Sequence, residues 1–225
     1  MKELSVIVPV YNEAATIGKV LEAIRNVPLE KEIIVVDDGS LDATSRILDA
    51  IRDDAIKVIH HGSNRGKGVA FLTGLARAQG EYIIIQDADL EYNPADYRVL
   101  LDTLKKGGCD MVLGTRFREG HKGLFMHRLG NRILTFALNI LFASHLNDYA
   151  TCYKLARKTI FDELDLTAKG FDIDVQIVCN ALKKHKTILE VPVSYFPRSY
   201  KEGKKIRWKD GVWALYYMLK YRFIP

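Results

Sequence analysis

The sequence has few cysteines, no long apolar run and no stretch rich in proline, glycine or serine. Its three cysteines, Cys109, Cys152 and Cys179, are odd in number and far apart, which excludes a disulfide framework or a cysteine zinc site and favours a reducing compartment. The longest nearly apolar stretch, Ile133–Ala143, has 11 residues, whereas a membrane-spanning helix needs about 20. The first residues begin a strand pattern and show no signal peptide. We therefore expect one cytoplasmic domain, residues 1–225.

Positive charge is concentrated near the C-terminus. The 225 residues are 48% hydrophobic and 27% charged, which is typical of soluble globular proteins. The net charge is +5, but Arg198–Pro225 holds eight basic and two acidic residues (8 − 2 = +6), whereas residues 1–197 hold 25 basic and 26 acidic ones (25 − 26 = −1). Such a basic tail indicates an anionic partner: nucleic acid, phosphate groups or a membrane surface. The absence of a compact DNA- or RNA-reading motif argues against nucleic acid.

Apolar runs alternate with segments of helical length in the first half of the chain. The runs predict strands at Leu4–Val10, Glu32–Val36, Ile56–Ile59, Tyr82–Ile85 and Met111–Leu113. The segments between them predict helices at Glu13–Asn26, Ala43–Ile51, Val69–Ala78 and Pro94–Lys106. Repeated strand–helix–strand units predict an α/β fold with a mostly parallel, doubly wound sheet, in which ligands bind beyond the carboxyl ends of the strands.

After Thr115 this alternation changes, and a basic stretch, Arg116–Arg132, leads into a helix from about His127 to Ala143. The remaining patterns predict a short strand near Thr151–Leu155, helices near Arg157–Leu164 and Asp172–His185, a strand at Thr187–Tyr195 and a helix at Trp208–Phe223. The last helix mixes aromatic and basic residues, which suits a helix lying on an anionic membrane surface. Packing of about half of its aromatic side chains on the domain is an equally good interpretation.

Asp87-Ala88-Asp89 directly follows a predicted buried strand, and Glu91 comes two residues later. Carboxylates this close repel one another unless a cation or hydrogen-bond donors offset the repulsion. Mg²⁺ or Mn²⁺ bound together with a diphosphate supplies that offset, since hard cations take carboxylate and phosphate oxygens. The alternative is a solvated loop whose aspartates cap the next helix.

Polar residues also end two neighbouring strands, as Asp37-Asp38-Gly39-Ser40 and Pro9-Val-Tyr-Asn-Glu13. An acidic residue at such a strand end can accept hydrogen bonds from a ribose, and Gly39 permits an unusual turn; helix capping is the alternative. Asn64-Arg-Gly-Lys-Gly68 lacks the spacing of a phosphate-binding P-loop and favours a tight turn. His60 and His61 are expected at the surface.

Together and in this order, these motifs resemble glycosyltransferase family 2 of the GT-A fold, and most closely its polyprenyl-phosphate mannose synthase branch. The match spans essentially the whole chain, through Pro9–Glu13, Asp37–Ser40, Asn64–Gly68, Asp87–Asp89, Asp148–Tyr153 and Arg198–Lys205. The resemblance implies a nucleotide-sugar-binding half, 1–115, and an acceptor-side half, 116–225. The chain lacks the QxxRW motif of processive polysaccharide synthases, which argues against polymerisation.

The resemblance also assigns roles to residues. It implies that the nucleotide sugar is bound by Pro9, Tyr11, Glu13, Asp37, Asp38, Lys67, Asp87, Ala88, Lys204 and Lys205. It implies a metal site of Asp87, Asp89 and Glu91, an acceptor-phosphate site of Arg116, Arg128 and Arg132, and catalytic roles for Asp89, Asp148 and Arg198. The expected reaction is transfer of a hexose, mannose first, to a polyprenyl phosphate.

Two alternatives stay open at this point. A hydroxyl acceptor would need a carboxylate base, for which Asp148 is the candidate, and a non-catalytic nucleic-acid-binding protein would use the basic tail. GDP-mannose is the first donor expected, followed by UDP-glucose and a UDP-N-acetylhexosamine. A peripheral position at the inner face of a membrane is expected, through the C-terminal helix or a membrane-embedded partner subunit.

Overall fold

The computed structural model describes residues 2–116, 125–198 and 208–224, and of residues 125–128 and 208–210 the backbone alone. The strands are β1 (Leu4–Val10), β2 (Lys31–Asp37), β3 (Ile56–His60), β4 (Tyr82–Ile85), β5 (Met111–Thr115), β6 (Lys154–Arg157) and β7 (Ile188–Pro192). The helices are α1 (Ile17–Arg25), α2 (Thr44–Asp49), α3 (Lys67–Leu75), α4 (Tyr97–Lys105), α5 (Phe125–Phe142), α6 (Lys158–Glu163), α7 (Ile173–Lys183) and α8 (Trp208–Phe223), with a 3₁₀ turn, η1 (Pro94–Asp96), before α4.

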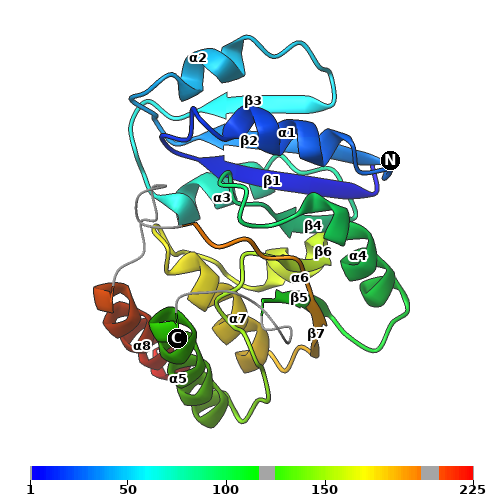
Figure 1. Cartoon of the computed structure of the whole chain (residues 1–225). Helices are drawn as coiled ribbons and strands as arrows, with labels where there is room; N and C mark the ends of the chain where they lie inside the picture. The colour runs from blue at the N-terminus through cyan, green and yellow to red at the C-terminus, as the bar shows by residue number, and fades with distance from the viewer. Residues whose placement is uncertain (1, 117–124, 199–207, 225) are drawn as a thin grey trace.

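The strands form a seven-stranded sheet in the order β3-β2-β1-β4-β6-β5-β7 (Figure 1). All neighbouring pairs are parallel except the two that involve β6, which runs antiparallel between β4 and β5. Strands β1, β2, β4 and β5 are almost entirely buried, as expected of parallel strands covered by helices on both faces. The predicted α/β sheet is confirmed.

The chain proceeds outward from β1 through β2 to β3 and then crosses back to β4 on the other side of β1. The strand order therefore reverses between β1 and β4, and such reversals place ligands beyond the carboxyl ends of the strands. Register puts Val10 of β1 opposite Asp37 of β2 and Ile7 opposite Ile85 of β4. The polar segments that follow these three strands consequently lie side by side.

Strand β6 starts three residues later than its sequence pattern predicts. The prediction near Thr151–Leu155 was wrong in its start, because Thr151 bonds through its side chain and the Cys152 N–H bonds to a side chain, neither of which is strand pairing. The Thr151 hydroxyl donates to the Gly114 carbonyl, and the Cys152 N–H donates to the Tyr92 hydroxyl at 3.0 Å. Because β6 is antiparallel, the loop before it arrives at the edge where its neighbours end.

Helices α5 and α8 lie side by side at the lower left of Figure 1, where α8 also packs against α7. Both were predicted from the sequence. Within the described residues, no helix combines the length and the apolar character that crossing a bilayer requires.

Candidate active site

Four chain segments meet at one edge of the sheet. Residues 9–13 end and follow β1, residues 37 and 38 end β2, residues 87–91 follow β4, and residues 148–153 precede β6. Parallel pairing of β1 with β2 and β4 and antiparallel pairing of β6 with β4 bring these segments together.

Asp37 is a buried residue whose carboxylate is held by protein donors. It accepts hydrogen bonds from the Ser40 N–H (3.0 Å) and the Ser45 hydroxyl (2.5 Å), and His60 Nδ1 lies 2.9 Å from it. Burial by itself would raise the pKa of Asp37, but these donors outweigh burial and hold the pKa below its usual value. Asp37 therefore fixes the turn that leads out of β2.

Asp38 fixes a second loop, and it does so together with His61. Its carboxylate accepts hydrogen bonds from the Arg65 N–H (3.0 Å) and the Gly66 N–H (2.7 Å). His61 Nδ1 lies 2.7 Å from Asp38, and His61 Nε2 lies 3.0 Å from the Thr73 hydroxyl. The prediction that His61 is a surface residue was wrong, because its side chain is only 6% exposed.

Two glycines allow this loop to pack closely. Gly39 has φ +71°, and a Cβ there would lie 2.5 Å from the Ser63 carbonyl carbon. Gly66 has φ +98°, and a Cβ there would lie 2.3 Å from the Lys169 carbonyl oxygen. Both positions combine a left-handed backbone with a close neighbour, so only glycine fits. The turn predicted over residues 64–68 is thus a contact between the two halves of the chain.

Arg198 lies among the carboxylates that follow β1 and β4. Its guanidinium approaches Asp89 at 2.8 Å and Glu13 at 3.1 Å. Its backbone N–H donates to Glu91 at 2.8 Å, and the Tyr195 hydroxyl donates to the other Glu91 oxygen at 2.9 Å. The Arg198 Nε is buried and has no hydrogen-bond partner among the described residues. The sequence-predicted residues Glu13, Asp89, Glu91 and Arg198 are therefore brought together.

Asp89 lies in surroundings that carry an excess of negative charge. Burial, together with the charges of Asp87 and Glu91, raises its pKa to about 7, although Arg198 opposes the shift. A divalent cation would relieve this repulsion, and carboxylate oxygens are the ligands that Mg²⁺ and Mn²⁺ prefer, so the donor set fits the predicted metal. Across residues 2–116, 125–198 and 208–224, no group of three or more His, Cys, Asp or Glu side chains is already arranged around a metal position.

Lys67 joins the strand end to α7. Its ammonium lies 2.8 Å from Asp87 and 2.9 Å from Asp174, and the buried Lys154 approaches the other Asp174 oxygen at 2.9 Å. Burial would raise the pKa of Asp174, but the two ammonium groups lower it to about 2. Sequence reasoning missed Asp174, because nothing in its own segment marks it and its partner Lys67 lies 107 residues away.

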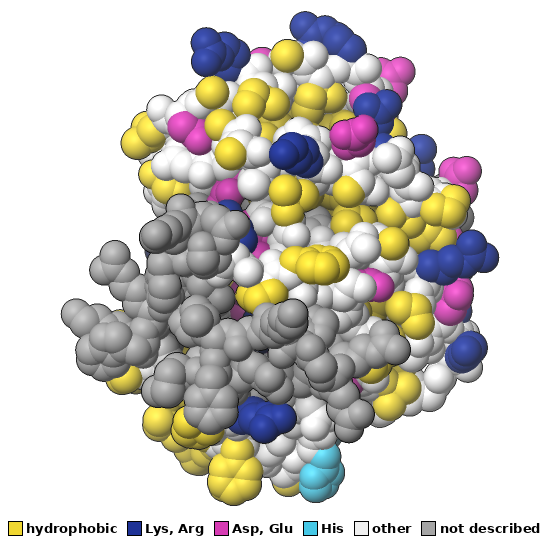
Figure 2. All heavy atoms as spheres, in the orientation of Figure 1, with side chains coloured by type: hydrophobic (Ala, Val, Ile, Leu, Met, Phe, Trp, Pro, Cys, Tyr) yellow, Lys and Arg dark blue, Asp and Glu magenta, His cyan; other side chains and the backbone are white. Residues whose placement is uncertain are grey.

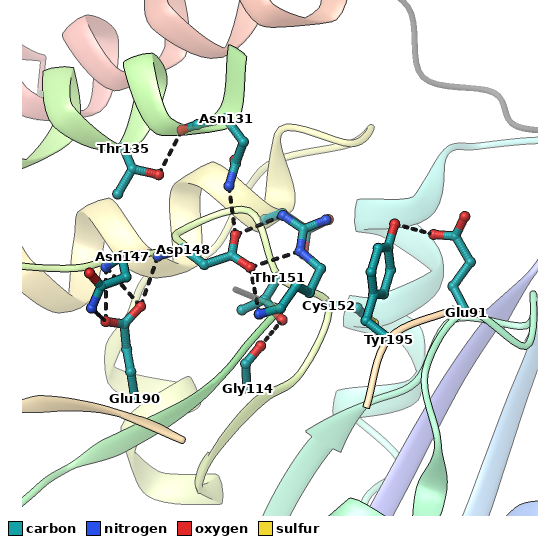
Figure 3. A network of polar contacts seen from close by, with 12 residues as sticks. Glu91, Gly114, Asn131, Thr135, Asn147, Asp148, Thr151, Cys152, Glu190 and Tyr195 are labelled. Atoms are coloured by element: carbon teal, nitrogen blue, oxygen red, sulfur yellow. Dashed lines mark hydrogen bonds and ion pairs between the residues drawn. The ribbon is translucent and has the colours of Figure 1, made fainter. Parts of the chain in front are cut away.

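Arg116 and Asp148, both predicted site residues, form an ion pair, and Figure 3 shows the polar contacts around Asp148. The buried Asp148 accepts hydrogen bonds from Arg116 Nε and Nη2, both at 2.7 Å, and from the Asn131 amide at 2.8 Å. Burial would raise the pKa of Asp148, but Arg116 outweighs burial and lowers it. The Asp148 N–H donates to Glu190 at 2.8 Å, and the Arg116 Cζ lies 5.3 Å from the centre of the Tyr195 ring.

The structure also places the other predicted site residues. Pro9 and Tyr11 are partly exposed at the end of β1, and Ala88 is buried between the two aspartates. Arg132 is exposed on α5, one residue after Asn131. The predictions for the Arg128 side chain, Lys204 and Lys205 fall outside the described residues.

Comparison with known sequences gives relatives at modest identity. The chain is 29% identical over 195 residues to the glycosyltransferase AglJ of Haloferax volcanii, covering 86% of this chain and 63% of AglJ. It is 28% identical over 202 residues to the low-salt glycan biosynthesis hexosyltransferase Agl6 of the same organism, of which it covers 48%. It is 28% identical over 233 residues to polyprenol monophosphomannose synthase of Mycolicibacterium smegmatis, covering 93% of this chain and 86% of that protein. The chain thus spans less than two thirds of the first two relatives.

Solved structures share the fold. Glucosyl-3-phosphoglycerate synthase from Mycobacterium tuberculosis in complex with UDP matches with a TM-score of 0.77 at 21% identity, over 100% of this chain and 81% of that one. The same enzyme with Mn²⁺, UDP and phosphoglyceric acid matches at 0.75 and 21%, over 100% and 80%. These likenesses identify the GT-A fold. Residues 5–165 match the profile of Glycosyl transferase family 2, and the chain therefore belongs to that family.

Proposed function

We propose that the protein transfers a hexose, mannose first, from a nucleotide-diphosphate sugar to a polyprenyl phosphate, with inversion at the anomeric carbon. The observation that carries this proposal is the Arg116–Asp148 pair. Asp148 is the carboxylate that a hydroxyl acceptor would need as a base, and it is fully buried and engaged by Arg116 and Asn131. Arg116, held in a fixed orientation, suits recognition of a phosphate group.

The proposed reaction needs no strong base. An acceptor phosphate has a second pKa of about 6, so it is largely ionised at neutral pH. One of its oxygens attacks the anomeric carbon and forms the new C–O bond. The bond from that carbon to the diphosphate breaks, and its electron pair leaves with the diphosphate. Arg116 positions the attacking phosphate, with Arg128 and Arg132 as the further residues proposed for this site.

On the donor side, the chain supplies charges of both signs. Arg198 already lies beside Asp89 and Glu13, and we assign it, with Lys204 and Lys205, to stabilising the negative charge that develops on the diphosphate. Pro9, Tyr11, Glu13 and the loops fixed by Asp37 and Asp38 surround the nucleoside. Asp87 and Asp89 are the residues proposed to hold Mg²⁺ or Mn²⁺, which would offset the charge of the diphosphate. Glu91, whose two oxygens are engaged by Tyr195 and Arg198, is proposed to support that site.

A small phosphate-bearing acceptor that attacks the anomeric carbon through a hydroxyl is the second candidate. A solved structure of the same fold holds UDP, Mn²⁺ and phosphoglyceric acid, which favours this class of acceptor. In that case Arg116 would bind the phosphate while another group would accept the hydroxyl proton. UDP-sugars would then replace GDP-mannose as the first donors to test.

The test is a donor and acceptor panel. First, thermal unfolding with Mn²⁺ and GDP-mannose, UDP-glucose or UDP-N-acetylglucosamine identifies the donor, because a ligand that binds the folded state raises its apparent stability. The donor is then assayed with a short-chain polyprenyl phosphate, the matching polyprenol, and 3-phosphoglycerate. Transfer to the polyprenyl phosphate alone supports the first proposal. Transfer to 3-phosphoglycerate alone contradicts it and supports the second.

The acceptor chemistry also sets the place of action. A polyprenyl phosphate is retained in a bilayer by its hydrocarbon chain, so the enzyme would act at the inner face of a membrane. An anionic membrane surface, or a membrane-embedded partner subunit, would keep it there. We expect the C-terminal helix α8 to contact that surface.

A further inference from the structure

Helices α5 and α8 expose two rows of large apolar side chains. On α5 the row is Leu129, Ile133, Phe136 and Ile140, and on α8 it is Val212, Tyr216, Leu219 and Phe223. Each row repeats at intervals of four, three and four residues, which places its members on one side of a helix. Phe136 and Ile140 are each 66% exposed, and Trp213 beside the α8 row is 58% exposed.

The domain core does not account for these rows, because other side chains of the same helices form it. Leu138 of α5 and Met218 and Tyr221 of α8 are buried. Both helices are thus apolar on the side that packs and on the side that does not. Exposed apolar side chains that gather on one face of a protein mark a contact surface, so the exposed rows indicate a partner.

The two rows belong to one surface, because α5 and α8 pack against each other. The Arg222 Nε donates to the Leu141 carbonyl at 2.9 Å, and the Arg222 Cζ lies 5.7 Å from the centre of the Phe142 ring. Figure 2 shows hydrophobic side chains gathered along the lower left edge, where Figure 1 places α5 and α8. We refer to the two rows together with Trp213 as the α5–α8 face.

The charges on these helices indicate the kind of partner that the exposed rows fit. The α5 sequence has two arginines and no acidic residue, and the α8 sequence has Lys209, Lys220 and Arg222 against Asp210. Lys220 Nζ lies 5.6 Å from the centre of the Tyr221 ring, which keeps a positive charge next to the aromatic side chains. Apolar and aromatic residues with a basic excess fit a bilayer that contains anionic lipid.

We propose that the α5–α8 face docks into the headgroup region of an anionic bilayer. The biological purpose of this docking rests on the proposed function. The docking itself is tested independently, since lipid binding is measured without any sugar donor or acceptor. Its consequence for the site follows from α5, where Asn131 contacts Asp148 and Ile133, two residues later, belongs to the exposed row. Docking would hold the Arg116–Asp148 pair close to the plane in which lipid phosphates lie.

The experiment uses the full chain and vesicles of phosphatidylcholine, with and without about one third phosphatidylglycerol. The protein contains two tryptophans, so a Trp208→Phe background leaves Trp213 as the single reporter of burial by its fluorescence shift. The test variant is Phe136→Gln with Ile140→Gln. The matched control is Val99→Gln, which changes an exposed apolar residue of α4 that lies outside the face.

We expect binding to the anionic vesicles with a blue shift of Trp213, and weaker binding at high salt. The double variant should need about tenfold more lipid for half-maximal binding, since binding scales with the apolar area that is buried, while Val99→Gln should bind as the parent does. Circular dichroism and thermal unfolding establish that the double variant is folded. If it is not, Ile133→Gln and Tyr216→Gln, each alone, replace it.

Three outcomes would overturn the proposal. One is the absence of binding to anionic vesicles at low salt. Another is unchanged binding by the folded double variant, which would place the contact elsewhere on the chain. The third is a dimer in sedimentation velocity that the double variant abolishes, without vesicle binding, which would make the face an interface between two copies. None of these depends on sugar transfer, so they are distinct from failure of the proposed function.

Discussion

The Asp148 carboxylate accepts three hydrogen bonds from Arg116, one from the arginine backbone N–H at 3.0 Å and two from the guanidinium at 2.7 Å. Backbone and side chain of the arginine are therefore fixed by one carboxylate. The Asn131 amide and the Glu190 carboxylate in turn fix Asp148. An arginine held in this way is oriented before its ligand arrives, which lowers the entropy lost on binding.

The first prediction concerns Asp148→Asn. The substitution leaves the partly buried Arg116 without its counter-charge, so we expect the free energy of unfolding to fall by about 3 kcal/mol, the lower end for an ion pair in the interior that loses one partner. In the folded fraction we expect a higher KM for the polyprenyl phosphate, with a smaller effect on kcat. Denaturant unfolding and steady-state kinetics measure the two effects.

The pH profile separates this positioning role from general-base catalysis. If Asp148 only orients Arg116, Asp148→Asn keeps the shape of the kcat profile, and Arg116→Lys, which keeps the charge but loses the paired hydrogen bonds, also raises KM. Loss of kcat with the disappearance of an acidic limb would instead identify Asp148 as a base and favour a hydroxyl acceptor.

The second prediction distinguishes Glu91 from Asp89. Both Glu91 oxygens are engaged, by the Tyr195 hydroxyl and the Arg198 N–H, and Glu91→Gln keeps one oxygen acceptor. We expect Glu91→Gln to weaken Mn²⁺ binding by about tenfold, the lower end of the effect of residues that support metal ligands. Asp89→Asn should abolish measurable binding. Equal losses in isothermal titration would show that Glu91 is itself a ligand.

The third prediction follows from the raised pKa of Asp89, about 7. Its pKa in the unfolded chain is about 3.9, so the folded state holds a proton that the unfolded state releases. Without metal, this contribution to stability is complete below about pH 4 and is lost as the pH rises through about 7. Mn²⁺ competes with the same proton and should therefore raise the melting temperature more at about pH 8 than at about pH 6.

Asp89→Asn is the control for this pH effect. Asparagine does not titrate, so the variant should lose both the metal-free slope and the pH dependence of the Mn²⁺ shift. A parent protein whose Mn²⁺ shift is the same at both pH values would contradict the assignment of the proton to Asp89.

The fourth prediction compares two aspartate–lysine pairs. Asp174→Asn leaves Lys67 and the buried Lys154 without their shared carboxylate, and we expect a loss of about 3–5 kcal/mol in the free energy of unfolding. The control Asp165→Asn breaks an exposed pair with Lys184, for which a loss of at most about 1 kcal/mol is expected. Urea unfolding at neutral pH measures both.

Low pH should weaken the same interactions of Asp174 with Lys67 and Lys154. The pKa of Asp174 is lowered to about 2, so its stabilising contribution is present above about pH 4 and is lost as the pH falls through about 2. The Asp174→Asn variant should lack this part of the acid transition. An acid transition of unchanged size in the variant would mean that other carboxylates carry it.

Much of the fold could be predicted because buried parallel strands are continuous apolar runs. Tyr82–Ile85 is such a run in the sequence and is fully buried in β4. Strand direction is not encoded in such a pattern, and neither are the side-chain hydrogen bonds that Thr151 and Cys152 make in place of strand pairing. Those two residues bond to Gly114 and Tyr92, which lie 37 and 60 residues earlier, and this displaced β6 from its predicted position.

The candidate site was predictable where residues follow strands, as at Asp38 and Asp89. It was not predictable where a side chain acts through a distant partner. Asp174 stands in the first turn of α7 and resembles an ordinary helix-start acid, and His61 follows an exposed neighbour. Burial and pairing of both arise only when the loops pack, which sequence spacing does not report.

The insertion of β6 between β4 and β5 sets an order of assembly. Strands β3, β2, β1 and β4 come from consecutive segments of the chain, so on a ribosome they can pair as soon as they emerge. Among the strands that the structure describes, β5 pairs with β6 and β7 alone, both of which are synthesised after it. Strands β3, β2, β1 and β4 can thus pair while β5 still awaits its neighbours, and a nascent chain interrupted before residue 154 would hold these four strands without the β6–β5–β7 part of the sheet.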